Sequence, residues 1–188
     1  LVDAGGVELA NCLKGVSMVV LAVPVLAMES VMSTLSRSLD QAAPDVVITD
    51  VGSTKATIRD CAERVFGRVM PNIVLGHPIA GSEKSGVAAA NPSLYVNHKV
   101  ILTPEPDVDP VALARVETLW RACGADVLQK SVERHDQVLA RTSHLPHLLA
   151  FSLVDTLARQ DERLDIFRYA AGGFRDFTRI AGRDPLMW

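Results

Sequence analysis

The chain has 188 residues, 48% of them hydrophobic, and a formal net charge of -3, which suits one large domain or a domain with a smaller partner. It contains no block of like charges and no apolar run of transmembrane length, so we expect it to bind neither nucleic acid nor a membrane. Cys12, Cys61 and Cys123 are widely separated and form no CxxC or Cys/His cluster. This spacing favours a cytoplasmic protein with reduced cysteines and without a metal site.

Short apolar runs alternate with helical patterns over the first 130 residues. Runs without strict alternation are typical of strands that are buried on both faces of a parallel sheet, and they occupy residues 17–24, 45–50, 72–75, 99–103 and 125–128. Helical patterns occupy residues 26–39, 54–65 and 110–123. The last of these has Asp109 as its N-cap and Pro110 at its first position. The order predicts an α/β domain with a doubly wound, mostly parallel sheet.

No further strand is expected after about residue 130. Residues 132–157 have the pattern of one long helix, which Pro146 should bend or interrupt. A second helical stretch covers residues 161–170, and a glycine pair precedes residues 174–188. We therefore expect two domains, an α/β domain at 1–130 and a helical one at 131–188.

Three of the predicted strands end in residues that suit a ligand site. Ligands of open α/β sheets bind beyond the carboxyl ends of the strands, and Val23-Pro24, Gly52-Ser53 and Gly76-His77 occupy these positions. Gly76 is expected to turn the chain at the end of its strand, and the helix start after Gly52 could attract an anion. The alternatives are structural: Ser53 as an N-cap and His77 as a half-buried histidine that ends a strand.

The helical part has its own polar candidates. Ser143 and His147 are four residues apart and share a helix face, but Pro146 and the lack of an acidic neighbour argue against a metal site there. Arg179 lies among apolar residues and is expected to be partly buried, where it would grip a carboxylate. That carboxylate is either Asp176 or a substrate.

Five segments in order resemble the prephenate dehydrogenases, a group that includes the arogenate and cyclohexadienyl dehydrogenases of tyrosine biosynthesis. The segments are "LAVPV" (21–25), "DVGSTK" (50–55), "GHPIAGSEKSG" (76–86), "SHLPH" (143–147) and "GGFRDFTRIAGRDPLMW" (172–188). The resemblance implies a Rossmann-type domain that binds NAD or NADP, followed by an all-helical dimerisation domain. The implied reaction converts prephenate to 4-hydroxyphenylpyruvate by oxidation and decarboxylation.

The resemblance also implies roles for individual residues. His77 corresponds to the catalytic histidine that hydrogen-bonds the ring hydroxyl of prephenate, and Ser53 to the serine beside it and the nicotinamide. The implied substrate-binding residues are Ser143, His147, Arg179, Asp176, Trp188 and Glu83. The expected cofactor contacts are Val23, Pro24, Gly52 and Ser53.

The chain lacks the GxGxxG phosphate loop of dinucleotide-binding folds, so we expect this loop upstream of residue 1 and the remaining dimerisation helices beyond residue 188. The sequence leaves open whether the substrate is prephenate, arogenate or both, and whether the cofactor is NAD or NADP. Other Rossmann dehydrogenases with helical second domains would be expected to use a catalytic lysine or a magnesium-binding acidic cluster, and neither is found. A non-catalytic nucleotide-binding regulatory module is the more distant alternative.

Overall fold

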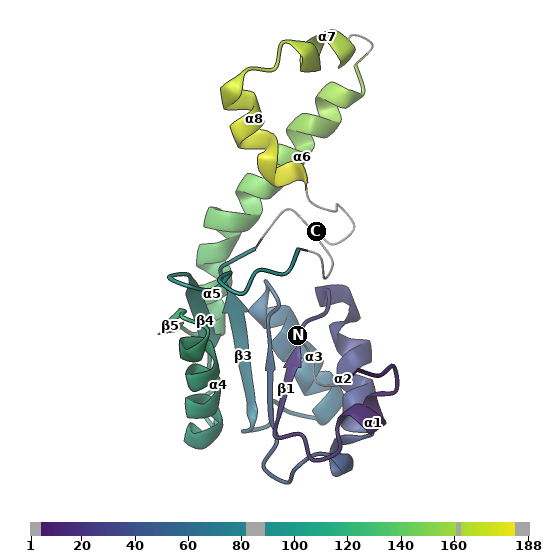
Figure 1. The fold of residues 1–188 in the computed structure, drawn as a ribbon, viewed down its shortest axis with the longest axis vertical. Coiled ribbons are helices and arrows are strands. Elements are labelled where there is room, and N and C mark those ends of the chain that lie inside the picture. Colours follow the sequence, from purple (N-terminus) through teal and green to yellow (C-terminus); the bar gives the residue numbers. More distant parts are fainter. Residues whose placement is uncertain (1–4, 82–88, 161–162, 183–188) are drawn as a thin grey trace. The chain divides into compact units, whose positions relative to one another are not determined.

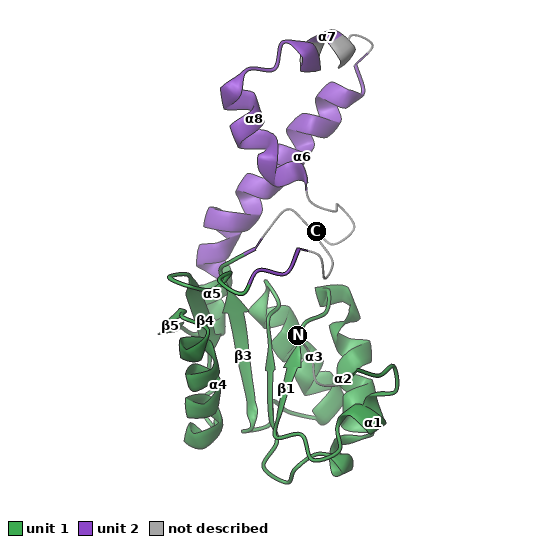
Figure 2. Cartoon of the chain, viewed as in Figure 1, with its two compact units in different colours: residues 1–80, 92–136 green, residues 81–91, 137–188 purple. Residues whose placement is uncertain are grey.

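The structure is a computed structural model that describes residues 5–81, 89–160 and 163–182. The chain divides into two compact units, one of residues 1–80 and 92–136 and the other of residues 81–91 and 137–188 (Figure 2). The first unit holds the sheet, and the regular elements described in the second are helical.

Five strands form one sheet in the order β1-β2-β3-β4-β5. Their bounds are β1 Met18–Leu21, β2 Val47–Asp50, β3 Ile73–Pro78, β4 Lys99–Thr103 and β5 Asp126–Gln129. Strands β1, β2 and β3 run parallel, β4 runs antiparallel to β3, and β5 runs parallel to β4. The described part of the connection between β3 and β4 contains no α-helix, which agrees with an antiparallel return. The mostly parallel sheet expected from the sequence is confirmed.

Helices cover both faces of the sheet (Figure 1). The helices of the first unit are α1 Leu9–Cys12, α2 Met28–Ser36, α3 Lys55–Phe66 and α4 Pro110–Ala122, with 3-10 turns η1 Val25–Ala27 and η2 Leu39–Gln41. Successive strand residues point to opposite faces, so Ile48 packs with α2 and α3 whereas Val47 packs with α4. Ile73 and Val74 divide between the same two cores. This burial on both faces explains why apolar and polar residues do not alternate in the strands, and it confirms the doubly wound fold.

Helix α4 begins as the sequence predicts. The Asp109 carboxylate accepts a hydrogen bond from the backbone N–H of Val111 at 3.0 Å, and Pro110 is the first helical residue. A cap of this kind contributes about 1 kcal/mol to stability.

The chain passes from the first unit to the second within a helix, α5, whose residues up to 136 belong to the first unit and whose residues from 137 belong to the second. Helix α5 spans Val132–Leu139, a π-helical turn follows at Ala140–His144, and α6 spans Leu145–Ala158. Pro146 has no N–H to donate to the carbonyl four residues earlier, so the irregular turn lies where the regular ladder is broken. The remaining elements are α7 Arg163–Arg168, α8 Gly172–Thr178 and the 3-10 turn η5 Arg179–Gly182. No helix in the described ranges is both long and apolar enough to cross a membrane.

One expectation about the third strand is wrong. The sequence suggested that the strand stops at Leu75 and that Gly76 turns the chain, but β3 continues through Pro78. His77 lies opposite Ile101 of β4 in the antiparallel register. Pairing with β4 adds hydrogen bonds beyond the apolar run, which extends the strand. Gly76 instead allows close packing, because an added Cβ would lie 3.1 Å from the Asp50 carbonyl oxygen.

Candidate active site

The carboxyl ends of β1, β2 and β3 lie along one edge of the sheet because these strands are parallel. Leu21 at the end of β1 is in register with Asp50 at the end of β2. In β3, His77 follows shortly after the residues that pair with β2. The single edge expected from the sequence is therefore present in the first unit, and it is the position where ligands of such sheets bind.

A buried ion pair closes the end of β2. The Lys55 ammonium donates to the Asp50 carboxylate and to the Gly76 carbonyl oxygen, and both charged side chains are almost fully buried. The same carboxylate accepts the backbone N–H groups of Gly52 at 2.7 Å and Gly76 at 3.0 Å. Burial lowers the pKa of Lys55, and the attraction of Asp50 opposes this shift. This network ties β3, just before His77, to the end of β2.

Gly52 has a structural function that the sequence does not reveal. A Cβ at this position would lie 2.2 Å from Ile58 Cδ1 and 3.1 Å from Asp50 Oδ2. Its N–H already donates to Asp50. The glycine therefore permits close packing within the protein, in addition to any approach of a ligand.

The N-terminus of α3 is capped by a residue distant in sequence. Asp136 accepts the N–H of Lys55 at 2.8 Å through Oδ1 and the N–H of Ala56 at 2.9 Å through Oδ2. The N-cap residue is Thr54, whose side chain makes no capping hydrogen bond, so the proposed alternative of Ser53 as N-cap is wrong. The anion expected at this helix start is a carboxylate of the protein itself.

A chain of hydrogen bonds runs from this carboxylate to His77. Asp136 Oδ1 lies 2.7 Å from His135 Nδ1, and His135 Nε2 lies 2.9 Å from His77 Nδ1. The two imidazole rings meet edge to face, with centroids 5.1 Å apart. His135 is fully buried, and His77 is half-buried.

The Asp136 carboxyl group is held in its charged form. Burial raises its pKa, but the N–H groups of Lys55 and Ala56 together with His135 outweigh burial and hold the pKa below its usual range. An ionised carboxylate only accepts hydrogen bonds, so His135 Nδ1 carries the hydrogen of the bond between them.

The remaining candidates of the first unit also lie at this edge. Val23 is partly buried and Pro24 exposed directly after β1, and Ser53 is partly buried after β2. Ser53 Oγ makes no hydrogen bond to His77 within the described residues. The neighbouring Thr54 Oγ1 is buried without a hydrogen-bond partner in the part of the chain described, so it is an unused polar group.

In the second unit, Ser143 and His147 are neighbours, as their spacing predicts. His147 Nδ1 lies 2.8 Å from the backbone carbonyl oxygen of Ser143, so Nδ1 carries a hydrogen in the bond. Both residues are partly buried.

Arg179 differs from the expectation. It begins η5 and is exposed, not partly buried, although Ile180 and Ala181 after it are partly buried. Asp176 is also exposed. Two further candidates, Glu83 and Trp188, lie outside the described residues.

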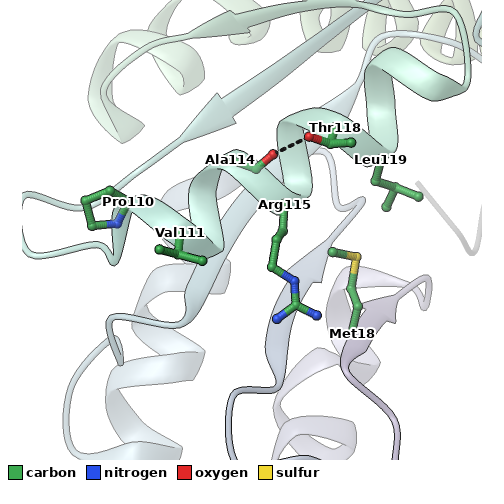
Figure 3. Close-up of a pocket in the computed structure, with 7 residues that line it drawn as sticks. All are labelled: Met18, Pro110, Val111, Ala114, Arg115, Thr118 and Leu119. Atoms are coloured by element: carbon green, nitrogen blue, oxygen red, sulfur yellow. Dashed lines mark hydrogen bonds between the residues drawn. The ribbon is translucent and has the colours of Figure 1, made fainter.

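A surface pocket of about 550 Å³ lies elsewhere on the first unit (Figure 3). It is lined by α4 residues and by Met18, the first residue of β1, so it adjoins the opposite end of the parallel strands from His77. The Arg115 guanidinium in this pocket donates to the backbone carbonyl oxygens of Ser17 and Asp45. Because this cation is used within the protein, we do not place the active site here.

Sequence inspection missed His135, Asp136 and Lys55. Lys55 falls within the quoted "DVGSTK" segment but was given no function. His135 and Asp136 are adjacent in sequence and lie close to the expected domain boundary. A histidine followed by an acidic residue was the signal that could have indicated a site here.

Comparisons with known proteins match both parts of the chain to one family. The family profile for "Prephenate dehydrogenase, nucleotide-binding domain" matches residues 1–129, and that for "Prephenate dehydrogenase, dimerization domain" matches residues 131–188. Cyclohexadienyl dehydrogenase of Zymomonas mobilis is 36% identical over 185 residues, which cover 96% of this chain and 61% of that protein. Prephenate dehydrogenase of Bacillus subtilis is 43% identical over 145 residues, which cover 77% of this chain and 39% of that protein.

A solved structure of prephenate dehydrogenase from A. aeolicus, in complex with hydroxyphenyl propionate and NAD+, is 42% identical and has a TM-score of 0.80. The match covers 92% of this chain and 58% of that one, so the chain spans less than two thirds of the length of these relatives. Both profiles, the relatives and the solved structure agree: the chain belongs to the prephenate dehydrogenase family.

Proposed function

We propose that the protein is a cytoplasmic, NAD(P)-dependent dehydrogenase that converts prephenate to 4-hydroxyphenylpyruvate in tyrosine biosynthesis. The observation that carries this proposal is the position of His77. It is a half-buried imidazole at the carboxyl-terminal edge of the parallel strands, in a domain that matches the nucleotide-binding profile of the family.

The chemistry suits an imidazole at this edge. Prephenate carries a hydroxyl group and a hydrogen on one ring carbon, and oxidation removes the hydrogen as hydride while the hydroxyl sheds its proton. We assign His77 as the acceptor of that proton, a function that contributes about 10²–10⁴-fold to the rate. Loss of the ring carboxylate as carbon dioxide leaves its electron pair to complete the aromatic ring, and the proton returns to the product oxygen.

A nicotinamide cofactor, NAD or NADP, supplies the hydride acceptor when bound. The residues present at the edge fit such a group, because Thr54 Oγ1 is a buried hydroxyl without a partner among the described residues. After the end of β1, Val23 and Pro24 offer an apolar surface, and Ser53 and Gly52 complete the proposed contacts. The structure of the related A. aeolicus enzyme holds NAD+, which supports a nicotinamide cofactor for this chain.

For the helical unit we propose substrate contacts. Arg179 is an exposed cation suited to a carboxylate of the substrate, with Asp176 one turn away on α8. His147 and Ser143 are partly buried polar groups that suit a pocket wall. Glu83 and Trp188 complete the proposed substrate site on the strength of the family resemblance alone.

We also propose a homodimer formed through the helical unit, which matches the dimerisation profile of the family. Large apolar side chains of this unit are exposed, as expected for a surface that a second copy covers. They include Leu145, Leu148, Leu149, Phe167, Tyr169 and Phe177.

Arogenate is a second candidate substrate. It differs from prephenate by an amino group in place of the side-chain keto group, and the relative from Z. mobilis is named a cyclohexadienyl dehydrogenase. A rate comparison of both substrates with both cofactors decides among these alternatives.

The experiment that tests the proposal measures NADH or NADPH formation by the full-length protein with prephenate. We expect His77→Asn to lower kcat by about 10²–10⁴-fold with little change in KM. The control is His98→Asn, which changes an exposed histidine of the same unit and should leave both constants unchanged. A wild-type protein that binds NAD but oxidises neither substrate would instead indicate a regulatory nucleotide-binding module.

A further inference from the structure

His135 and Asp136 form a hydrogen-bonded chain that ends at Nδ1 of the proposed proton acceptor, His77, and neither was among the residues that the sequence suggested. His135 is 0% exposed, and its two ring nitrogens face two different groups, Asp136 Oδ1 at 2.7 Å and His77 Nδ1 at 2.9 Å. A buried imidazole with both nitrogens engaged has a defined arrangement of hydrogens. That arrangement determines which nitrogen of His77 carries a hydrogen.

The order of hydrogens follows from Asp136. Its two oxygens accept the N–H groups of Lys55 and Ala56, which favours the ionised carboxylate, so the hydrogen in the bond to His135 belongs to His135 Nδ1. In neutral His135 with its hydrogen on Nδ1, the other ring nitrogen, Nε2, holds a lone pair. A lone pair on Nε2 can only accept, and the facing nitrogen, His77 Nδ1, must therefore donate.

We propose that His135, held by Asp136, is a positioning residue that keeps the hydrogen of neutral His77 on Nδ1, which leaves the lone pair on His77 Nε2 for the hydroxyl proton of the substrate. This inference rests on the proposed function and extends it. The opposite tautomer of His77 would present an N–H where an acceptor is required.

The arrangement also accounts for the charge that develops during the reaction. When Nε2 of His77 takes the hydroxyl proton, the ring becomes a cation that still donates through Nδ1 to His135. His135 in turn donates to the Asp136 carboxylate, so the new positive charge is connected through two hydrogen bonds to a fixed negative one. The proton balance is closed, because the proton returns from His77 to the product oxygen.

The test combines nuclear magnetic resonance with kinetics on the full-length protein. Labelling of histidine rings with nitrogen-15 identifies the protonated nitrogen of His77 at neutral pH. In the wild type we expect Nδ1 to be protonated and Nε2 to be bare. In His135→Phe, which keeps a ring but removes the acceptor, we expect the Nε2–H tautomer of His77 to appear and kcat to fall by about 10- to 100-fold, with KM little changed.

Two further variants separate positioning from folding. His135→Gln offers an amide oxygen to His77 Nδ1, so it should recover the wild-type tautomer and part of the lost kcat. Glu133→Gln is the matched control on α5, because Glu133 joins α5 to α3 through Arg59 at 2.7 Å and is not part of the chain from Asp136 to His77. It should leave the tautomer and kcat unchanged.

The outcomes that overturn the inference are distinct from failure of the proposed function. An Nε2–H tautomer in the wild type, an unchanged tautomer in His135→Phe, or an equal loss of kcat in Glu133→Gln would each overturn it. A wild-type protein that does not oxidise prephenate or arogenate would reject the proposed function, whereas the tautomer measurement would still decide the hydrogen-bond order.

Discussion

The ammonium of Lys55 and the carboxylate of Asp50 form an ion pair inside the first unit, with 0% and 1% of their side chains exposed. The pair joins the first residue of α3 to the last residue of β2, and Lys55 also binds the carbonyl oxygen of Gly76 in β3. Charges buried this deeply are costly unless each has its partner. The pair therefore holds the end of β2 against the strand that carries His77.

We expect Lys55→Met to destabilise the protein by about 3–5 kcal/mol, because it leaves the buried Asp50 charge without its partner. Urea unfolding at neutral pH measures this change as the free energy of unfolding. The double variant Asp50→Asn/Lys55→Met removes both charges and should be more stable than the single variant. Equal stability of the single and double variants would show that the buried Asp50 carboxylate does not destabilise the protein when Lys55 is removed.

Substitution by alanine is expected to lower the free energy of unfolding at Gly76 and to raise it at Gly173. At Gly76 the added Cβ would meet the Asp50 carbonyl oxygen and Leu102 Cδ2, each at 3.1 Å, so Gly76→Ala should cost about 1–3 kcal/mol. At Gly173, within α8, nothing lies within 4 Å of the added Cβ among the described residues, and Gly173→Ala should add about 0.4–1 kcal/mol. Thermal unfolding of both variants checks the signs, and a neutral Gly76→Ala would contradict the close packing at the site.

Asp136 should make stability depend on pH in the acidic range. Its folded-state pKa lies below the ordinary value of about 3.9, so its stabilising contribution is fully present above that value and is lost as pH falls through the folded-state pKa. Asp136→Asn should therefore lose more unfolding free energy relative to wild type at pH 6 than at pH 3. The control Asp126→Asn breaks an exposed ion pair to Lys99 and should show a small difference at both pH values.

The sheet, the two-sided core and the cap of α4 could be predicted from the sequence because each depends on neighbouring residues. The continuous apolar runs around Ile48 and Val74 follow from burial on both faces, and Asp109-Pro110 is a local helix start. The position of His77 at the ligand edge followed from the same local patterns.

The rest depends on contacts between residues distant in sequence. Asp136 caps α3 from 81 residues away, and the N-cap residue is Thr54, not the local candidate Ser53. The extension of β3 through His77 depends on pairing with β4, and no pattern within β3 indicates it. Burial of Arg179 was inferred from its apolar neighbours, but partly buried neighbours such as Ile180 do not determine whether a long charged side chain between them reaches solvent.

The proposed dimer can be tested at Leu148 of α6, which is 62% exposed. If a second copy covers this surface, Leu148→Glu should place a charge in an apolar interface and shift the protein from dimer to monomer. Analytical ultracentrifugation of the full-length protein measures the change. The control is Leu26→Glu, because Leu26 is 94% exposed in the first unit and should tolerate a charge. A dimer unaffected by Leu148→Glu would exclude this side chain from the interface.

The proposed contact between Arg179 and a substrate carboxylate should affect KM more than kcat. A charge-assisted hydrogen bond contributes about 1.5–3 kcal/mol, so Arg179→Gln should raise KM for prephenate by about 10- to 100-fold. A smaller change in kcat is expected, because the arginine holds the substrate in the ground state as well as in the transition state. Arg175→Gln is the matched control, since Arg175 is an exposed arginine one turn earlier in α8. An unchanged KM in Arg179→Gln, or an equal rise in Arg175→Gln, would remove Arg179 from the substrate site and leave the carboxylate to another cation.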